Sequence, residues 1–244
     1  MRVMISQSHF FPWIEYIKLI NQVDTFVFLD DVQFPNSART LQKRVQILNE
    51  KKIIWLSIPV EKISKNIKAN QVKIFNKLDW RKDHLNLLKN KYKKSKNFKN
   101  LDVIIEDFYK KDYEYLIQAT RDSTKLLLNY FDILKNIKTL DSIDLNIKAE
   151  NPNERILKIL KEVNATEYIT AKGSLNYLDH DNLKKNGIET FYPDYEYFTY
   201  QQLNENFNPF VSTLDFIANS GKKFQDIKPT KLVDWKTYLK SKIE

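Results

Sequence analysis

Val-Met-Ile at 3–5 opens the stretch of sequence that decides the fold of this chain. It is followed by Ser-Gln-Ser-His-Phe-Phe-Pro-Trp-Ile-Glu-Tyr at 6–16, Phe-Val-Phe-Leu at 26–29 and Asp-Asp-Val-Gln-Phe at 30–34. A short apolar strand, a polar and aromatic loop, an amphipathic helix and a second apolar strand follow one another here. This order is typical of the opening of a parallel α/β sheet. In such sheets, ligands bind just beyond the carboxyl ends of the strands, so the two polar clusters predict a ligand site.

The rest of the chain continues the alternation of helices and strands. Hydrophobic periodicity predicts helices at 14–23, 79–94, 100–110, 112–131, 152–163 and 213–219, and strands at 52–58, 72–75, 136–140, 166–170 and 188–192. The strand at 52–58 is expected to be buried, and Asp79 is expected to cap the helix that follows it. We therefore expect one α/β domain over residues 1–244, with a parallel or mixed sheet flanked by helices and a helical insertion around 79–134.

The composition excludes several kinds of site. The chain has 244 residues and no Cys, so it has no disulfide, thiolate nucleophile or Cys-based metal site. It has three Gly, too few for the usual glycine-rich loop of a Walker-type NTPase or a dinucleotide-binding fold. The His and Glu spacings typical of zinc sites do not occur, and we expect no metal. The absence of a signal pattern and of a membrane-length apolar run predicts a soluble, cytoplasmic protein without a membrane span.

The chain is basic, with 40 Lys and Arg against 31 Asp and Glu and a net charge of +9. One interpretation is an anionic partner, such as a nucleotide sugar, a nucleic acid or an acidic carrier protein. The other is a composition bias that places Lys on every solvated face. Lys82, Lys89, Lys93 and Lys96 gather along one side of the predicted helix at 79–94, which would suit docking of an acidic acyl-carrier protein.

Asp30 and Asp31 are the best acid, base or metal candidates, because they end a predicted strand. Successive side chains on a strand point to opposite faces, so one Asp at most enters a given cleft. Asp31 shares a face with Gln33 and is the predicted catalytic carboxylate. Asp30 would then be structural, pairing with a Lys or Arg, or would contact the substrate; a turn pair without chemistry is the alternative.

Two of the three His residues are candidate bases. His9 lies in the first loop, where a neutral imidazole would take a proton near pH 7 unless it is only bonded to backbone. Trp80 and His84 are four residues apart and share a helical face, which presents a stacking ring and a base together. The alternative for His84 is a core His between helix and sheet. His180 lies among Asp and Asn residues and is interpreted as a solvated helix start.

The remaining candidates would hold the substrate. Gln7, Trp13 and Tyr16 would orient it by hydrogen bonding and stacking, although core packing is the alternative for Trp13. Arg44 is the best single phosphate ligand, because its planar fork fits a diphosphate bidentately. Lys172 and Tyr177 follow another predicted strand and would line the same cleft. The full predicted binding set is Gln7, Trp13, Tyr16, Asp30, Gln33, Arg44, Trp80, Lys172 and Tyr177.

Several of these segments resemble the WbqC-like family, known mainly from gene clusters for bacterial surface polysaccharides. The resemblance is carried by Gln-Ser-x-aromatic-x-Pro-Trp-x-x-Tyr at 7–16, Asp-Asp-Val-Gln-Phe at 30–34, Trp-Leu-Ser-Ile-Pro-Val at 55–60, Trp-Arg-Lys-Asp-His-Leu at 80–85 with Tyr92, Ala-Thr-Glu-Tyr-Ile at 165–169 with Gly173 and Tyr177-Leu178, and Phe-Asn-Pro-Phe-Val-Ser-Thr-Leu-Asp at 207–215 with Asn-Ser-Gly at 219–221. The chain departs from the family pattern at Glu15, where Gly is usual, and this residue is expected to add a charge beside the site.

The resemblance implies an enzyme of surface-glycan biosynthesis, for O-antigen or capsule. The hypothesis that fits best is a transferase that places an acyl or aminoacyl group on a nucleotide-linked amino sugar. The acyl donor would arrive on a carrier, and the enzyme would need no cofactor. Arg44 would hold the diphosphate, and His84 or Asp31 would take the proton from the attacking amine. A non-catalytic nucleic-acid or tRNA-binding module is the alternative. Nucleotidyl transfer is a weaker one.

Overall fold

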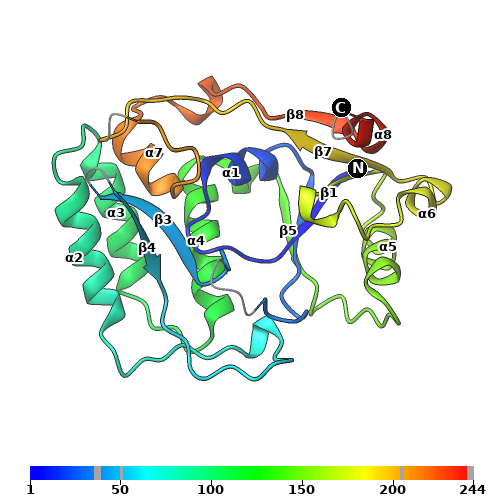
Figure 1. Cartoon of the computed structure of the whole chain (residues 1–244), viewed down its shortest axis with the longest axis horizontal. Coiled ribbons are helices and arrows are strands. Elements are labelled where there is room, and N and C mark those ends of the chain that lie inside the picture. The colour runs from blue at the N-terminus through cyan, green and yellow to red at the C-terminus, as the bar shows by residue number, and fades with distance from the viewer. Residues whose placement is uncertain (36–39, 50–51, 204–205, 241–244) are drawn as a thin grey trace.

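Within the part of the chain that the computed structural model describes (residues 1–35, 40–49, 52–203 and 206–240), six strands form a central sheet (Figure 1). They are β1 (Arg2–Ser6), β2 (Thr25–Phe28), β5 (Lys138–Asp141), β6 (Glu167–Ile169), β7 (Glu189–Asp194) and β8 (Lys231–Asp234). Their order across the sheet is β5-β2-β1-β6-β7-β8. The first five are parallel and β8 pairs antiparallel with β7, so the predicted α/β class with a parallel or mixed sheet is confirmed.

The strand order reverses beside the first strand. The chain runs from β1 outward through β2 to β5, then returns across β1 to build β6, β7 and β8. A doubly wound α/β sheet has this arrangement, in which the first strand is central and the fourth parallel strand lies on its other side. Ligands of such sheets bind beyond the carboxyl ends of the strands at the reversal, which in this chain lies between β1 and β6.

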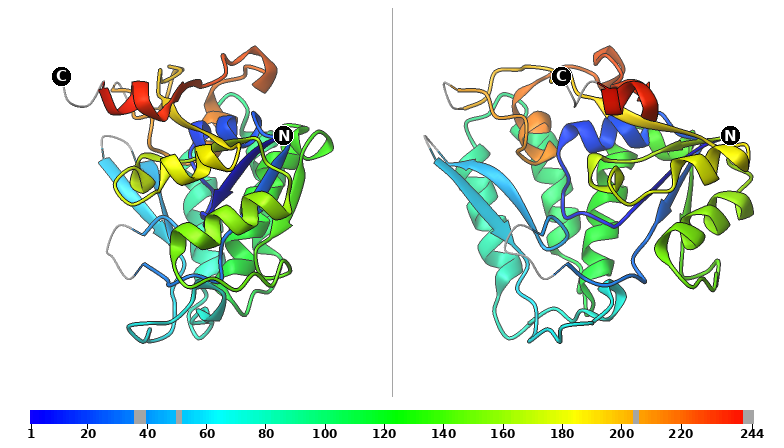
Figure 2. Two further views of the ribbon diagram at one scale, coloured as in Figure 1. Left: turned by 90° about the vertical axis from the view of Figure 1, so that its right-hand side faces the viewer. Right: turned by 45° about the vertical axis from the view of Figure 1, so that its right-hand side comes forward.

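Helices cover both faces of the sheet (Figures 1 and 2). They are α1 (Ile14–Ile20), α2 (Trp80–Tyr92), α3 (Phe98–Tyr109), α4 (Leu116–Tyr130), α5 (Pro152–Glu162), α6 (His180–Lys185), α7 (Thr213–Asn219) and α8 (Trp235–Lys240). Strand alternation divides the core: Val3 and Ile5 pack with α5 and α6, whereas Met4 packs on the opposite face with α1 and α4. Both faces are apolar because parallel strands are covered on both sides.

The predicted helical insertion around 79–134 is confirmed as α2, α3 and α4, which lie between β4 (Lys52–Ser57) and β5. One apolar cluster runs from the sheet through α1 into these helices and includes Phe26, Leu88, Phe108 and Leu127. The insertion is therefore packed onto the sheet and shares its core. Short 3-10 turns lie at Ala69–Gln71, Ile133–Lys135, Lys172–Ser174 and Phe224–Asp226.

Three local predictions are wrong. The segment at 52–58 is not a buried strand of the main sheet: β4 pairs with β3 (Arg44–Asn49) in a separate antiparallel hairpin, and Trp55 is 36% exposed. Its alternating exposure fits a strand with one solvated face. Residues 72–75 form isolated bridges instead of a strand, because their partners are single residues. Asp79 precedes α2 as expected, but its side chain makes no capping hydrogen bond.

Among the helices of the described residues, none is both long enough and apolar enough to cross a membrane.

Candidate functional site

The carboxyl ends of β1, β2 and β5 bring together charged groups that lie far apart in the sequence. Asp30 follows β2 and is fully buried. Its carboxylate accepts hydrogen bonds from the Ser8 backbone N–H at 2.9 Å, the Ser8 hydroxyl at 3.0 Å and Arg121 Nε at 2.6 Å. Burial raises the pKa of Asp30, while Arg121 and Ser8 oppose that rise. Asp30 thus fixes the loop after β1 to the end of β2.

Arg121 of α4 connects three elements. Besides Asp30 it holds Asp141 at the end of β5, with Nη2 3.0 Å from Oδ1 and Nη1 bonded to Oδ2. Its guanidinium also lies over the Phe28 ring at 5.5 Å. The carboxylates of Asp30 and Asp141 and the guanidinium of Arg121 are mostly buried, and their ion pairs connect the ends of β2 and β5 to α4.

Asp31 points to the opposite face of the sheet. It accepts a hydrogen bond from Ser142 Oγ at 2.6 Å and pairs with Arg155 Nη2 of α5. Its side chain stays 16% exposed, whereas Asp30 is at 0%. Each of the two neighbouring carboxylates pairs with its own Arg, Asp30 with Arg121 of α4 and Asp31 with Arg155 of α5. Of the two, Asp31 is the one that solvent reaches.

The loop after β1 is held by hydroxyl groups of α4 and α7. Ser123 accepts the Phe11 backbone N–H at 3.0 Å, and Thr124 donates to the His9 carbonyl at 3.1 Å. From the other side, Ser212 donates to the Phe11 carbonyl at 2.9 Å. Phe11 has a φ of +38°, which a bulky residue adopts only where its surroundings impose it. The loop is therefore fixed in shape.

His9, Trp13 and Tyr16 form an aromatic group on this loop and the start of α1. The His9 ring lies 4.6 Å from Tyr16 and 5.6 Å from Trp13, nearly parallel to the latter. Burial lowers the pKa of His9 to about 4, so the imidazole is neutral at pH 7. Its Nδ1 is buried and has no hydrogen-bond partner among the described residues. The Tyr16 hydroxyl donates to the Gln7 carbonyl at 3.1 Å, and burial raises the pKa of Tyr16.

Gln7 and Gln33 lie at adjacent strand ends. The Gln7 amide is 3.5 Å from the Gln33 carbonyl, and the Gln33 amide donates to the Lys65 carbonyl at 2.9 Å. Gln33 is exposed and Gln7 is partly so. The structure thus places Gln7 beside Gln33, in the segments that follow β1 and β2, and Asp31 lies in the second of these segments.

Lys172 and Tyr177 lie in the segment after β6, across the point where the strand order reverses. Both side chains are exposed, with Tyr177 at 59%. Asn153 of α5 fixes this segment: its Nδ2 donates to the Tyr177 carbonyl at 2.8 Å, and its Oδ1 accepts the Asp179 N–H at 2.9 Å. Asn153 lies two residues before Arg155, so a single turn of α5 positions both Asp31 and the loop after β6.

Arg44 and Trp55 lie on the hairpin, apart from the sheet. The Arg44 guanidinium is 4.7 Å above the Trp55 ring, and the segment that precedes Arg44 touches the first loop through the Phe10 N–H and the Leu41 carbonyl at 3.2 Å. A guanidinium over an exposed ring is a stacked cation–π arrangement. Arg44 therefore belongs to the hairpin, and its guanidinium faces Trp55 of the paired strand.

Trp80 and His84 lie in the core of the helical insertion. His84 Nε2 donates to the Ser57 carbonyl at 3.1 Å, which leaves Nδ1 to accept from the Tyr109 hydroxyl at 3.2 Å. Burial lowers the pKa of His84 to about 4. Trp80 is buried and donates to Asn76. Both ring nitrogens of His84 are engaged in these hydrogen bonds, so neither is free to take a proton from a substrate. This geometry favours the interpretation of His84 as a core residue.

Two further expectations are corrected. His180 is buried and stacked on Trp235 at 4.8 Å, with Nε2 2.8 Å from the Tyr192 hydroxyl, so it is not a solvated helix start. Glu15 is also buried, and it pairs with Lys18 at 2.9 Å and accepts from Thr230 at 2.9 Å. Its charge is neutralised there and adds nothing beside the candidate site.

The sequence analysis missed Arg121, Arg155 and Asp141 as members of the site. Arg155 and Arg121 are each a single Arg in a predicted helix, and Arg121 lies in the polar run Thr120 to Thr124 of a helix whose apolar residues predict a buried face. Such a run in a core-facing helix is a usable signal. Over the residues that the structure covers, no three His, Asp or Glu side chains are grouped to hold a metal ion.

The family model of the WbqC-like protein family matches residues 7–227, which include the loop after β1, the strands β2 and β5, the helices α4 and α5 and the loop after β6. The chain belongs to the WbqC-like protein family. It is similar to the uncharacterized protein Rv1507c of Mycobacterium tuberculosis (strain ATCC 25618 / H37Rv), with 26% identity over 227 residues that cover 92% of this chain and 96% of that protein. No solved structure matches the chain.

Proposed function

We propose that this WbqC-like protein is a transferase of bacterial surface-glycan biosynthesis that places an acyl or aminoacyl group on a nucleotide-linked amino sugar. The observation that carries the proposal is the reversal of strand order between β1 and β6, where the loop with Gln7 and His9 faces the loop with Lys172. Doubly wound sheets bind nucleotides at that position. The family's association with polysaccharide gene clusters supplies the substrate class.

In the proposed reaction, the amine nitrogen of the sugar attacks the carbonyl carbon of the acyl donor. The amide N–C bond forms, the bond from that carbon to the leaving group breaks, and the electron pair departs with the leaving group. His9 would accept the amine proton, because its imidazole is neutral at pH 7. Asp31, fixed by Arg155, would bind the sugar's amine or hydroxyl groups. Lys172 would bind the phosphates.

The acyl donor would arrive on an acidic carrier that docks on α2. Only Lys82 and Lys89 of the predicted Lys stripe lie in α2, which ends at Tyr92. Lys89 is neutralised, because it pairs with Glu106 and with Asp102 at 3.3 Å. Lys82, Lys93 and Lys96 remain exposed. This neutralisation also weakens the case for a nucleic-acid-binding module, which would need the full stripe to contact phosphates.

Ligand binding tests the proposal first. A UDP-linked amino sugar at 100 times its dissociation constant is expected to stabilise the protein by roughly 2.7 kcal/mol, measured by thermal unfolding at fixed ionic strength. Lys172→Gln is expected to weaken that binding about tenfold, because it removes one charge-assisted hydrogen bond. Lys185→Gln, an exposed Lys on α6, is the matched control and is expected to change nothing.

Turnover then tests the base. Once a donor supports reaction, His9→Gln is expected to lower kcat by about 10²–10⁴ and to leave nucleotide-sugar binding intact. Stabilisation by a short RNA alone, lost on addition of salt, would contradict the transferase and favour the nucleic-acid-binding module.

A further inference from the structure

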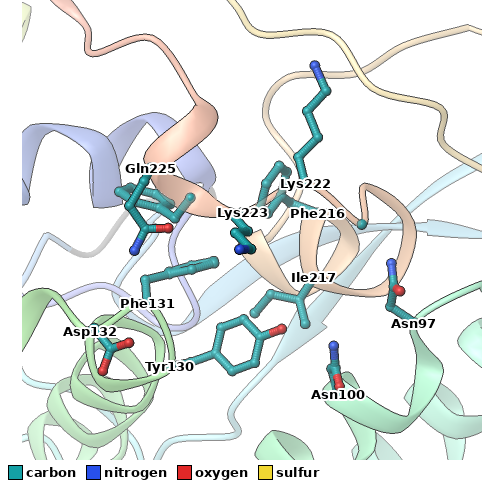
Figure 3. Close-up of a pocket in the computed structure, with 12 residues that line it drawn as sticks. Asn97, Asn100, Tyr130, Phe131, Asp132, Phe216, Ile217, Lys222, Lys223 and Gln225 are labelled. Atoms are coloured by element: carbon teal, nitrogen blue, oxygen red, sulfur yellow. The ribbon is translucent and has the colours of Figure 1, made fainter.

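A pocket of about 430 Å³ lies at the far end of α4 from the candidate site (Figure 3). Arg121, near the start of that helix, touches the carboxyl ends of the strands, whereas the pocket is lined by Tyr130, Phe131 and Asp132, where the helix ends. Its other walls come from the start of α3, from α7 and from the segment that follows α7. The volume is within the range of small-molecule sites, about 300–1,000 Å³.

The floor of the pocket is aromatic. Phe131, Phe216 and Phe224 are buried, and the rings of Phe131 and Phe224 are 4.6 Å apart. Tyr130 is 38% exposed and is the ring that a ligand reaches. In Figure 3 its ring stands between Phe131 and Asn100. A rigid floor with one accessible ring suits the apolar face of a ring-shaped ligand.

Carboxamides supply the polar groups of the rim. Asn97, Asn100 and Gln225 line the pocket, and the buried Nδ2 of Asn97 has no hydrogen-bond partner in the described chain. Gly221 leaves room for this amide, since a Cβ added there would lie 3.2 Å from Asn97 Nδ2. A carboxamide both donates and accepts, as a ligand hydroxyl group does. An unpartnered donor at the wall of a pocket points to a polar ligand that completes it.

The charges at the pocket come from two neighbouring Lys residues and one Asp. Lys222 lies 4.7 Å over the Phe198 ring and extends away from the other labelled side chains, whereas Lys223 lines the pocket and is seen among them in this view (Figure 3). Asp132 pairs with Lys135 at 2.6 Å. The charge of Asp132 is therefore compensated, and Lys223 is the cation presented to a ligand.

We propose that this pocket binds a hexose that carries one anionic substituent. The sugar ring would stack on Tyr130, its hydroxyl groups would bond to Asn97, Asn100 and Gln225, and its anionic group would pair with Lys223. The site is separate from the strand ends, so it would bind this sugar whether or not the proposed transfer reaction is correct.

Titration calorimetry of the full-length protein with glucuronate, glucose 6-phosphate, glucose and acetate tests the site. At least one anionic hexose is expected to bind saturably and about 10–100-fold more tightly than glucose, the range for one hydrogen bond to a charged group. Acetate is expected not to bind. Glucuronate alone would identify a carboxylate ligand, and glucose 6-phosphate alone a phosphate.

Three variants localise the binding. Lys223→Gln is expected to abolish the preference for the anionic hexose, whereas Lys222→Gln removes the same charge one residue away and is expected to keep it. Tyr130→Ala is expected to weaken every hexose, with unfolding midpoints confirming that each variant is folded. No saturable binding of either anionic hexose, or the same effect of both Lys substitutions, would overturn the proposal.

Discussion

At the scale of single residues, Asp30 and Asp31 are adjacent in the chain and have different surroundings. Asp30 is sealed between Ser8 and Arg121, and Asp31 stays partly exposed beside Arg155. Both follow the end of β2 at Phe28, and each is fixed by an Arg from a different helix, α4 for Asp30 and α5 for Asp31. One carboxylate can therefore hold the scaffold while the other remains open to a ligand.

Removal of Arg121 tests whether the buried Asp30 and its cation stabilise the fold. Arg121→Met leaves Asp30 buried without its cation and is expected to lower the free energy of unfolding by about 3–5 kcal/mol, measured by urea denaturation. Lys231→Met breaks an exposed pair with Asp194 and is expected to leave the free energy of unfolding nearly unchanged, because water screens that pair. Equal losses in the two variants would show that Arg121 does not compensate a buried charge.

His84 gives a prediction for pH dependence. Its pKa falls from 6.5 to about 4 on folding, so below pH 6.5 the unfolded chain binds a proton that the folded protein does not. The stability that His84 contributes is complete above pH 6.5 and is lost as pH falls toward 4, by about 3 kcal/mol. Urea denaturation at pH 7 and pH 4.5 measures the free energy of unfolding, and its decrease between these pH values should be smaller in His84→Gln than in the unchanged protein. An equal decrease in both proteins would show that a group other than His84 titrates.

At the scale of elements, the loop between β1 and α1 is shaped by helices that lie more than 100 residues away in the chain. Hydroxyl groups of α4 and α7 hold its backbone, including the strained Phe11. This dependence explains why a short loop keeps a positive φ at a bulky residue. It also keeps His9 beside Trp13 and Tyr16 before any ligand binds.

Ser123→Ala tests this support. It leaves the buried Phe11 N–H without an acceptor, and is expected to cost about 1–3 kcal/mol and to speed hydrogen exchange of the Phe11 amide. Ser95→Ala is the control: Ser95 is also buried, but its hydroxyl has no partner in the part of the chain that the structure describes. An unchanged exchange rate at Phe11 would show that Ser123 is not what holds the loop.

Most elements were predictable from local pattern. The strands around Val3 and Phe26 and the helices α4 and α5 follow apolar periodicity, which depends only on which faces are buried. The hairpin was not recognised as a separate unit, because an apolar run such as Ile53 to Leu56 has the same sequence signature whether it enters a large sheet or a small one. The choice between these depends on long-range partners.

At the scale of the whole molecule, the C-terminal segment crosses back to α1. Thr230 precedes β8 and donates to Glu15 Oε2, which is buried in α1 with Lys18. In Figure 1 the segment that leads into β8 and α8 runs above α1. The contact joins residues 215 positions apart, so it ties the two ends of the described chain into one folded unit.

A double-mutant cycle measures how much the hydrogen bond between Thr230 and Glu15 contributes to stability. Glu15→Gln and Thr230→Val are each expected to destabilise the protein, and their coupling free energy is expected to be about 0.5–3 kcal/mol, from urea denaturation of the two single variants and the double variant. A control cycle of Glu15→Gln with Lys185→Gln, on the distant helix α6, should be additive. Additive effects for Glu15 and Thr230 would show that their hydrogen bond contributes nothing to stability.

The sequence by itself determined the α/β class, the helical insertion and the position of Gln7, Asp31, Gln33 and Lys172 at strand ends, because periodicity and parallel strand direction are local properties. Tertiary structure alone decided the roles of the charged and titratable groups. Arg121 reaches Asp30 across 91 positions, and His84 is withdrawn into a core by Tyr109 and Ser57. A pKa or an ion pair depends on burial and on partners brought together by folding, which no short sequence window contains.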